Sequence, residues 1–240
     1  MSDLTLISGA LNFRDTGGLP AGSGVTRHGM LFRSGNLATV DERGLEALRG
    51  LALRRIIDLR DDEEVVRAPS IVGEGPETIR VPLFHGSVGS FFQRDVGLDE
   101  LYRSMIDDSA DRVVDVVRGV IGVQPVLVHC TVGKDRTGVT VALTLLAAGV
   151  DLDAVVADYA RTERMLPEAR NREVVRRIRS VHPDATRIEE LATRSPAPVM
   201  SALMSELTER YGAPVEFLRA HGLADDEIAE LRRVLVAPSS

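Results

Sequence analysis

Two kinds of hydrophobic segment alternate along the chain, and their order predicts an α/β fold. Short aliphatic, β-branched runs are expected to form strands at residues 30–35, 55–59, 78–83 and 126–129. Between and after them, hydrophobic residues at helical spacing predict helices at residues 39–50, 98–106, 111–120 and 136–150. Strands that alternate with helices favour parallel pairing, so we predict a largely parallel central sheet with helices on both faces.

The chain beyond residue 162 is almost wholly helical in pattern. We expect one domain over residues 1–240, in which residues 163–236 form an additional helical region. The helix expected at residues 168–180 contains Arg170, Arg172, Arg176, Arg177 and Arg179. These arginines are interpreted as a basic lid over the site, or alternatively as a solvated helix face, which the glutamates among them favour.

Composition and charge exclude several classes of protein. The 240 residues are 44% hydrophobic, as in ordinary globular proteins, and a formal net charge of −7 argues against a nucleic-acid partner. The apolar tract at residues 139–150 is too short to span a bilayer, so no integral membrane segment is expected. A single cysteine and the absence of a secretory signal pattern predict a cytoplasmic protein, with export by a dedicated apparatus as the alternative. The sequence does not indicate an oligomeric state.

The only cysteine, Cys130, lies in a short polar loop between the strand at 126–129 and the helix expected from Arg136. A glycine-containing loop before a helix directs backbone N–H groups inward and forms an anion cradle. These groups, the helix dipole and Arg136 favour the thiolate over the thiol, which makes Cys130 a candidate nucleophile. Phosphate fits such a cradle, because a guanidinium donates two hydrogen bonds to its oxygens. The alternative is that Cys130 is a small buried apolar residue.

The string HCTVGKDRTG at residues 129–138 resembles the signature loop of the protein-tyrosine phosphatase superfamily. Its GKDRTG part is similar to the bacterial tyrosine/serine phosphatase branch, whose loop also resembles that of inositol-lipid phosphatases. NFRD at residues 12–15 and FRSG at residues 32–35 resemble the amino-terminal pattern of the same branch. The resemblance implies a protein-tyrosine-phosphatase-like fold and hydrolysis of phosphate monoesters, with no metal and no cofactor.

The chemistry of the loop and the resemblance together suggest a role for each residue. Cys130 is expected to attack phosphorus and form a thiophosphoryl intermediate that water hydrolyses. Phosphate binding is assigned to Thr131, Val132, Gly133, Lys134 and Arg136, with backbone N–H groups stabilising the transition state. Supporting roles are assigned to His129, which positions the loop, to Thr137, which assists the leaving thiolate, and to Asp15.

The proton donor for the leaving group is expected to be Asp135, inside the loop. Related phosphatases often carry an acidic residue after the third strand, whereas residues 83–87 here contain no acid. Asp15, Asp95 and His85 are the alternatives. The run at residues 61–64 is interpreted mainly as a solvated helix cap. Arg14, Asp15 and Arg33 are expected either to form salt bridges that fix the opening segment or to act near the substrate.

The sequence therefore predicts a cysteine-dependent phosphatase that acts on phosphotyrosine and, more broadly, on phosphoserine, phosphothreonine or phosphoinositides. Lys134 adds a second positive charge that suits substrates with several phosphates, or alternatively is a solvated lysine paired with Asp135. Two rival functions are a pseudophosphatase that binds phosphorylated partners without turnover and, with less support, a rhodanese-type sulfurtransferase.

Overall fold

The computed structural model describes residues 7–83 and 89–238, and a five-stranded sheet lies at its centre. In spatial order the strands are β1 (Arg14–Asp15), β4 (Leu31–Ser34), β7 (Val126–His129), β5 (Arg55–Asp58) and β6 (Glu77–Arg80). Only β1 is antiparallel to its neighbour, while β4, β7, β5 and β6 pair in parallel. The predicted largely parallel sheet is confirmed.

A second, smaller sheet joins the beginning and the end of the chain. It contains β2 (Pro20–Ala21), β3 (Gly24–Thr26) and β8 (Val236–Pro238), and all of its pairs are antiparallel. The strands β2 and β3 form a hairpin. The strand β8 was not predicted, because the last helix was expected to continue through residue 236.

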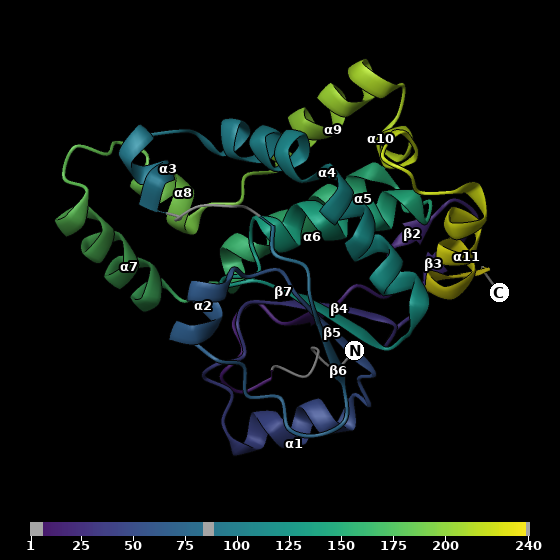
Figure 1. Cartoon of the computed structure of the whole chain (residues 1–240), viewed down its shortest axis with the longest axis horizontal. Coiled ribbons are helices and arrows are strands. Elements are labelled where there is room, and N and C mark those ends of the chain that lie inside the picture. Colours follow the sequence, from purple (N-terminus) through teal and green to yellow (C-terminus); the bar gives the residue numbers. More distant parts are fainter. Residues whose placement is uncertain (1–6, 84–88, 239–240) are drawn as a thin grey trace.

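Helices cover both faces of the large sheet (Figure 1). They are α1 (Glu42–Gly50), α2 (Asp62–Arg67), α3 (Gly89–Arg94), α4 (Leu98–Gly122), α5 (Arg136–Ala147), α6 (Leu152–Met165), α7 (Glu168–Val181), α8 (Ile188–Thr193), α9 (Ala197–Tyr211), α10 (Pro214–Ala220) and α11 (Asp225–Leu235). In Figure 1, α1 lies below the sheet, whereas α4, α5 and α6 lie above it with α9 and α10 beyond. No helix in the described part of the chain is both long and apolar enough to cross a membrane.

Alternation along the strands explains the two faces. Leu31, Ile57 and Val126 belong to the larger hydrophobic cluster, which contains α4, α5 and α6. Their neighbours Phe32 and Leu127 belong to the smaller cluster on the α1 side. Successive side chains of a strand point to opposite faces, so each central strand contributes to both cores. Hydrophobic packing against helices therefore holds the sheet on both faces and fixes the positions of its strand ends.

Three predicted boundaries were wrong. Residues 98–106 and 111–120 lie in one helix, α4, which continues through a local departure from helical geometry at Ser109 (φ −138°). The helix expected at residues 136–150 ends at Ala147, and Gly149 (φ +89°) lies in the turn that follows. The strand expected to reach residue 83 ends at Arg80, and Pro82 has no N–H to continue the ladder. Helix α8 lies within the additional helical region expected at residues 163–236.

Candidate active site

The loop after β7, residues 130–136, is called the Cys130 loop below. β7 lies between β4 and β5 and is parallel to both, so the loop emerges where three strands end at the same edge. Cys130 is buried, with 3% of its surface exposed, and α5 begins at Arg136. Strand, loop and helix thus follow in the predicted order, and the thiol lies near the positive end of α5.

Gly133 gives the loop its tight curvature. Its φ of +74° lies in the left-handed region, and its N–H donates to Cys130 Sγ at 3.3 Å. A Cβ at this position would lie 2.4 Å from the backbone carbonyl of Ser34, so only glycine fits against the end of β4. The N–H groups of residues 131, 132, 134, 135 and 136 donate to no acceptor among the described residues. These donors are available for an anion.

Arg136 is held by a carboxylate that sequence reasoning missed. Its Nη1 donates to Glu64 Oε2 at 2.6 Å and its Nη2 to Glu64 Oε1 at 2.7 Å, across 72 residues of sequence. Thr131 Oγ1 also donates to Glu64 Oε1. Burial raises the pKa of Glu64, but the hydrogen bonds and charge of Arg136 outweigh it and hold the pKa at about 2. Glu64 thus holds both terminal nitrogens of the Arg136 guanidinium in a fixed orientation beside Cys130.

The acidic run after β5 places Glu64 there. Asp61 caps α2 by accepting from the N–H of Glu64, and the Glu64 carboxylate accepts in return from the N–H of Asp61. This capping box fixes the first turn of α2 next to the end of β5. The interpretation as a solvated cap holds for Asp62 and Glu63, which are exposed, and is wrong for Glu64, whose side chain is 15% exposed.

The Glu64 ion pair should make stability depend on acidity. We expect Glu64→Gln to lower the free energy of unfolding at pH 7 by about 3 kcal/mol, from the distance between pKa values of 4.5 and about 2. Since the folded pKa is depressed, the contribution is present above pH 4.5 and is lost as the pH falls towards 2. Urea unfolding should show that the difference shrinks to about half or less by pH 3.

Glu63→Gln is the matched control, because Glu63 is the exposed neighbour in the same helical turn. It should change the free energy of unfolding by less than about 0.5 kcal/mol at any of these pH values. An equal loss in both variants, or a Glu64→Gln difference that does not change with pH, would contradict the structural importance of the Glu64–Arg136 pair.

Lys134 and Asp135 form a buried pair inside the loop. Lys134 is 1% exposed, and its Nζ donates to Asp135 Oδ1 at 2.6 Å. The same oxygen accepts a hydrogen bond from Tyr102 Oη at 2.8 Å. Of the alternative interpretation, a solvated lysine paired with Asp135, the pairing is present, whereas the solvation is wrong because Lys134 is buried. The Asp135 side chain remains 22% exposed, so one side of this carboxyl is accessible.

The two supporting residues of the loop make few polar contacts. His129 Nδ1 lies 3.3 Å from the carbonyl oxygen of Cys130, and its Nε2 has no hydrogen-bond partner among the described residues. Burial lowers the pKa of His129, against the opposing effect of Asp58, so the ring is neutral near pH 7. Thr137 Oγ1 is buried and also has no such partner in the described part of the chain. Neither side chain is hydrogen-bonded to Sγ.

The opening segment supports the loop from behind. Arg14 Nε and Arg33 Nη1 each donate to Asp158 at 2.7 Å, and all three side chains are at most 2% exposed. Arg33 Nη2 and Asn12 Nδ2 donate to the carbonyl oxygen of Gly133, at 3.0 and 2.8 Å. The salt-bridge interpretation of Arg14 and Arg33 is therefore what the structure contains, and the bridge reaches the loop backbone.

The alternative proton donors lie elsewhere. Asp15 accepts from the N–H groups of Gly17 and Gly29 and lies 3.1 Å from His28 Nδ1. Asp95 accepts from Thr186 and from the N–H of Arg187, at the start of α8. Their hydrogen bonds within the described residues do not reach the Cys130 loop. His85 lies outside the described residues.

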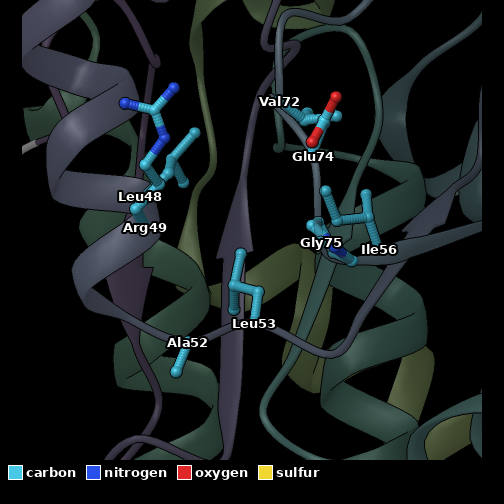
Figure 2. Close-up of a pocket in the computed structure, with 9 residues that line it drawn as sticks. Leu48, Arg49, Ala52, Leu53, Ile56, Val72, Glu74 and Gly75 are labelled. Carbon is cyan, nitrogen blue, oxygen red and sulfur yellow. The ribbon is translucent and has the colours of Figure 1, made fainter.

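A separate hollow of about 160 Å³ lies beside α1 (Figure 2). It is lined by Leu48, Arg49, Ala52, Leu53, Ile56, Val72, Glu74, Gly75 and Pro76. Ile56 is near the start of β5, whereas Cys130 follows the end of the parallel strand β7. The hollow is therefore at the opposite end of the strands from the Cys130 loop and is not part of the site.

The side chains around the Cys130 loop are suited to binding and attacking a tetrahedral anion. Residues 130–136 bring together a buried thiol, an oriented guanidinium, free backbone N–H groups and a partly exposed carboxyl. Within residues 7–83 and 89–238, no cluster of three or more histidine, cysteine or acidic side chains could hold a metal ion.

Comparisons with known proteins give matches to phosphatases. The model of the tyrosine phosphatase family matches residues 5–237. The chain is 29% identical over 273 residues to the triple specificity protein phosphatase PtpB of Mycobacterium tuberculosis, covering 96% of this chain and 98% of that one. It is 26% identical over 212 residues to a tyrosine-protein phosphatase of Nostoc commune, covering 83% and 72%. A solved structure, the catalytic domain of the PP-IP phosphatase SIW14 from S. cerevisiae, aligns over 82% of this chain and 92% of its own with a TM-score of 0.38 and 14% identity.

Proposed function

This chain belongs to the tyrosine phosphatase family, and from that premise we propose that Cys130 and Arg136 carry out the hydrolysis of phosphate monoesters. The proposal rests on one observation. The buried Cys130 thiol lies beside the Arg136 guanidinium, whose two terminal nitrogens are held by Glu64. Thr131, Val132, Gly133 and Lys134 complete the phosphate site, mainly through the free N–H groups of the loop.

The proposed reaction has two steps. The Cys130 thiolate attacks phosphorus, the bond from phosphorus to the ester oxygen breaks, and that oxygen takes a proton from Asp135 as the alcohol leaves. Water then attacks the phosphocysteine, its proton passes to Asp135, and the sulfur departs as thiolate with inorganic phosphate as product. Arg136 and the loop N–H groups stabilise the equatorial oxygens in both steps. His129 orients the loop through the Cys130 carbonyl.

Asp135 is the proposed proton donor because it lies in the Cys130 loop itself, whereas the hydrogen bonds of Asp15 and Asp95 lie elsewhere. Its carboxyl is partly exposed, next to a thiol that is buried. Asp15 and Asp95 are engaged by backbone N–H groups elsewhere. We assign Asp15 instead to holding the turn that precedes β4.

The substrate class is proposed to be broad. The Mycobacterium tuberculosis relative is named a triple specificity phosphatase, and it aligns with nearly the whole of this chain. The loop contains two cationic side chains, Lys134 and Arg136, which are paired with Asp135 and Glu64 respectively. We propose phosphotyrosine as a substrate, with phosphoserine, phosphothreonine and phosphoinositides as further ones.

The same proposal treats residues 1–240 as one phosphatase domain, with residues 163–236 as an added helical region that partly covers the site. Burial and the charge of Arg177 lower the pKa of Arg170 in α7, and the charge of Asp135 opposes them. Arg170 therefore lies close enough to the Cys130 loop for its charge to interact with that of Asp135. In Figure 1, α3, α7 and α8 gather beyond the sheet on the side of α2.

A thiolate enzyme with one cysteine is suited to a reducing compartment, and we propose the cytoplasm.

The proposal is tested by turnover of a substrate panel. We expect hydrolysis of p-nitrophenyl phosphate, and of phosphotyrosine peptides with kcat/KM above about 10³ M⁻¹ s⁻¹, measured beside phosphoserine peptides and phosphoinositides. Binding of the phosphopeptides without turnover would favour a pseudophosphatase. Sulfur transfer from thiosulfate to cyanide, without phosphate release, would favour a sulfurtransferase.

A further inference from the structure

Two buried tyrosines form a hydrogen-bonded chain that ends on Asp135. Tyr102 in α4 and Tyr159 in α6 are both 0% exposed. Their hydroxyl oxygens lie 2.7 Å apart, and Tyr102 Oη lies 2.8 Å from Asp135 Oδ1. The rings meet edge to face, with centroids 6.1 Å apart and planes at 84°. The mechanism proposed above assigns no role to either residue.

The direction of this chain follows from its last member. A carboxylate only accepts, so Tyr102 donates its single proton to Asp135, and Tyr159 must then donate to Tyr102. Burial and Asp135 raise the pKa of Tyr102 well above its usual value, and burial also raises that of Tyr159. Both hydroxyls therefore stay protonated at any working pH, and the chain keeps one direction.

These contacts select one oxygen of the carboxyl. Tyr102 and Lys134 both donate to Oδ1, and Oδ2 has no hydrogen-bond partner among the described residues. An aspartate carboxyl that rotates freely about its Cβ–Cγ bond would present either oxygen in many directions. With Oδ1 held by two donors, Oδ2 is fixed as the oxygen left for the substrate, and proton transfer depends steeply on such alignment.

The packing keeps the tyrosines in place independently of the loop. Gly138 lies in the first turn of α5, and a Cβ there would lie 3.1 Å from the Tyr159 ring, so glycine lets this ring approach the helix closely. The residue before Tyr159 is Asp158, which holds the loop carbonyl through Arg33. Adjacent residues of α6 thus support two different points of the Cys130 loop.

We propose that Tyr102 and Tyr159 are positioning residues, which align Asp135 for proton transfer to the leaving group. The inference rests on the proposed role of Asp135 as proton donor. Tyr102 acts directly, and Tyr159 acts through Tyr102. Lys134 shares the acceptor, while Arg136 and Arg170 are the other charged groups that face Asp135. Removal of the Tyr102 hydroxyl should therefore impair both proton transfers of Asp135, of which only the first depends on the leaving group.

The test compares two aryl phosphates with different leaving groups. The p-nitrophenolate ion departs without a proton, whereas phenolate is a poor leaving group and needs one. We expect Tyr102→Phe to lower kcat/KM for phenyl phosphate at least roughly tenfold more than kcat/KM for p-nitrophenyl phosphate, because kcat/KM reports the step in which the leaving group departs. Tyr159→Phe should show the same selectivity to a smaller extent. Phenylalanine keeps the ring packing, and Tm reports whether the fold is intact.

A double-mutant cycle separates positioning from general loosening. Asp135→Asn alone should show the same selective loss, and Tyr102→Phe combined with Asp135→Asn should be no worse than Asp135→Asn. Tyr211→Phe, at the third tyrosine of the chain, is the matched control and should leave both substrates unaffected. If the rate loss of Asp135→Asn depends on the leaving group and that of Tyr102→Phe does not, the inference about the tyrosines is wrong while the proposed role of Asp135 stands. If Asp135→Asn is not selective, the proposed proton donor is wrong and the tyrosines have nothing to align.

Discussion

Replacement of Cys130 by serine should lower kcat/KM for p-nitrophenyl phosphate by at least about 10⁴-fold. A serine hydroxyl keeps its proton at neutral pH and needs an adjacent base before it can attack. None is in place, because the hydrogen bond to Cys130 Sγ within the described residues comes from the N–H of Gly133, which is a donor. The His129 ring faces the Cys130 carbonyl instead.

Binding should survive this change, which makes the loss specific to chemistry. Arg136, Glu64 and the loop N–H groups are untouched by the substitution, so Cys130→Ser protein should still bind inorganic phosphate with an affinity within about tenfold of wild type. Titration calorimetry measures this, and Tm reports the fold. Wild-type turnover by the Cys130→Ser protein would remove Cys130 as the nucleophile and with it the proposed mechanism.

The parts of the site that lie close together in sequence could be predicted from sequence. Residues 126–139 contain a strand, a polar loop and a helix in immediate succession, so the local pattern alone places Cys130 at the end of a strand and Arg136 at the start of a helix. The alternation of strands and helices likewise predicts a largely parallel sheet. Both depend on spacing along the chain rather than on distant contacts.

Glu64 shows where this reasoning stops. Its spacing from Asp61 predicts a capping box, which is present, and a capping box by itself suggests a solvated helix end. Its contact with Arg136 depends on β5 lying next to β7, which the chain order does not fix. Had the sheet order been known, the helix directly after β5 would have been the place to search for a partner of the Arg136 guanidinium.

Asp158 and Tyr159 were hidden for a related reason. They lie on a helix whose pattern of hydrophobic residues indicates only that one face is buried, and a polar residue on that face cannot be matched to its partner from spacing alone. The available signal was the pair Arg14 and Arg33 in segments expected near the sheet edge. Two arginines at buried positions require a carboxylate, but the sequence does not say which of its 36 acidic residues provides it.

The buried charges behind the loop lead to the second large effect, a loss of about 3–5 kcal/mol in the free energy of unfolding on Asp158→Asn. Burial and the neighbouring Arg33 already lower the pKa of Arg14 to about 10, against the opposing charge of Asp158. An asparagine would leave two guanidiniums facing each other with no counter-charge, in a site where all three side chains are at most 2% exposed. Arg33 also holds the Gly133 carbonyl, so phosphate affinity should fall along with stability.

The pH dependence and a control separate this effect from simple damage to α6. Burial raises the pKa of Asp158, but Arg14 and Arg33 outweigh it and hold the pKa at about 2. A depressed pKa means that the stabilisation is present above the ordinary value of 3.8 and is lost as the pH falls through about 2. Urea unfolding should therefore show a constant difference between wild type and Asp158→Asn from pH 7 to pH 4, and a difference that shrinks as the pH falls further towards 2. Asp153→Asn, at an exposed position of the same helix, should cost less than about 1 kcal/mol. Equal losses in the two variants, with phosphate affinity unchanged, would show that the Arg14–Asp158–Arg33 cluster does not support the Cys130 loop.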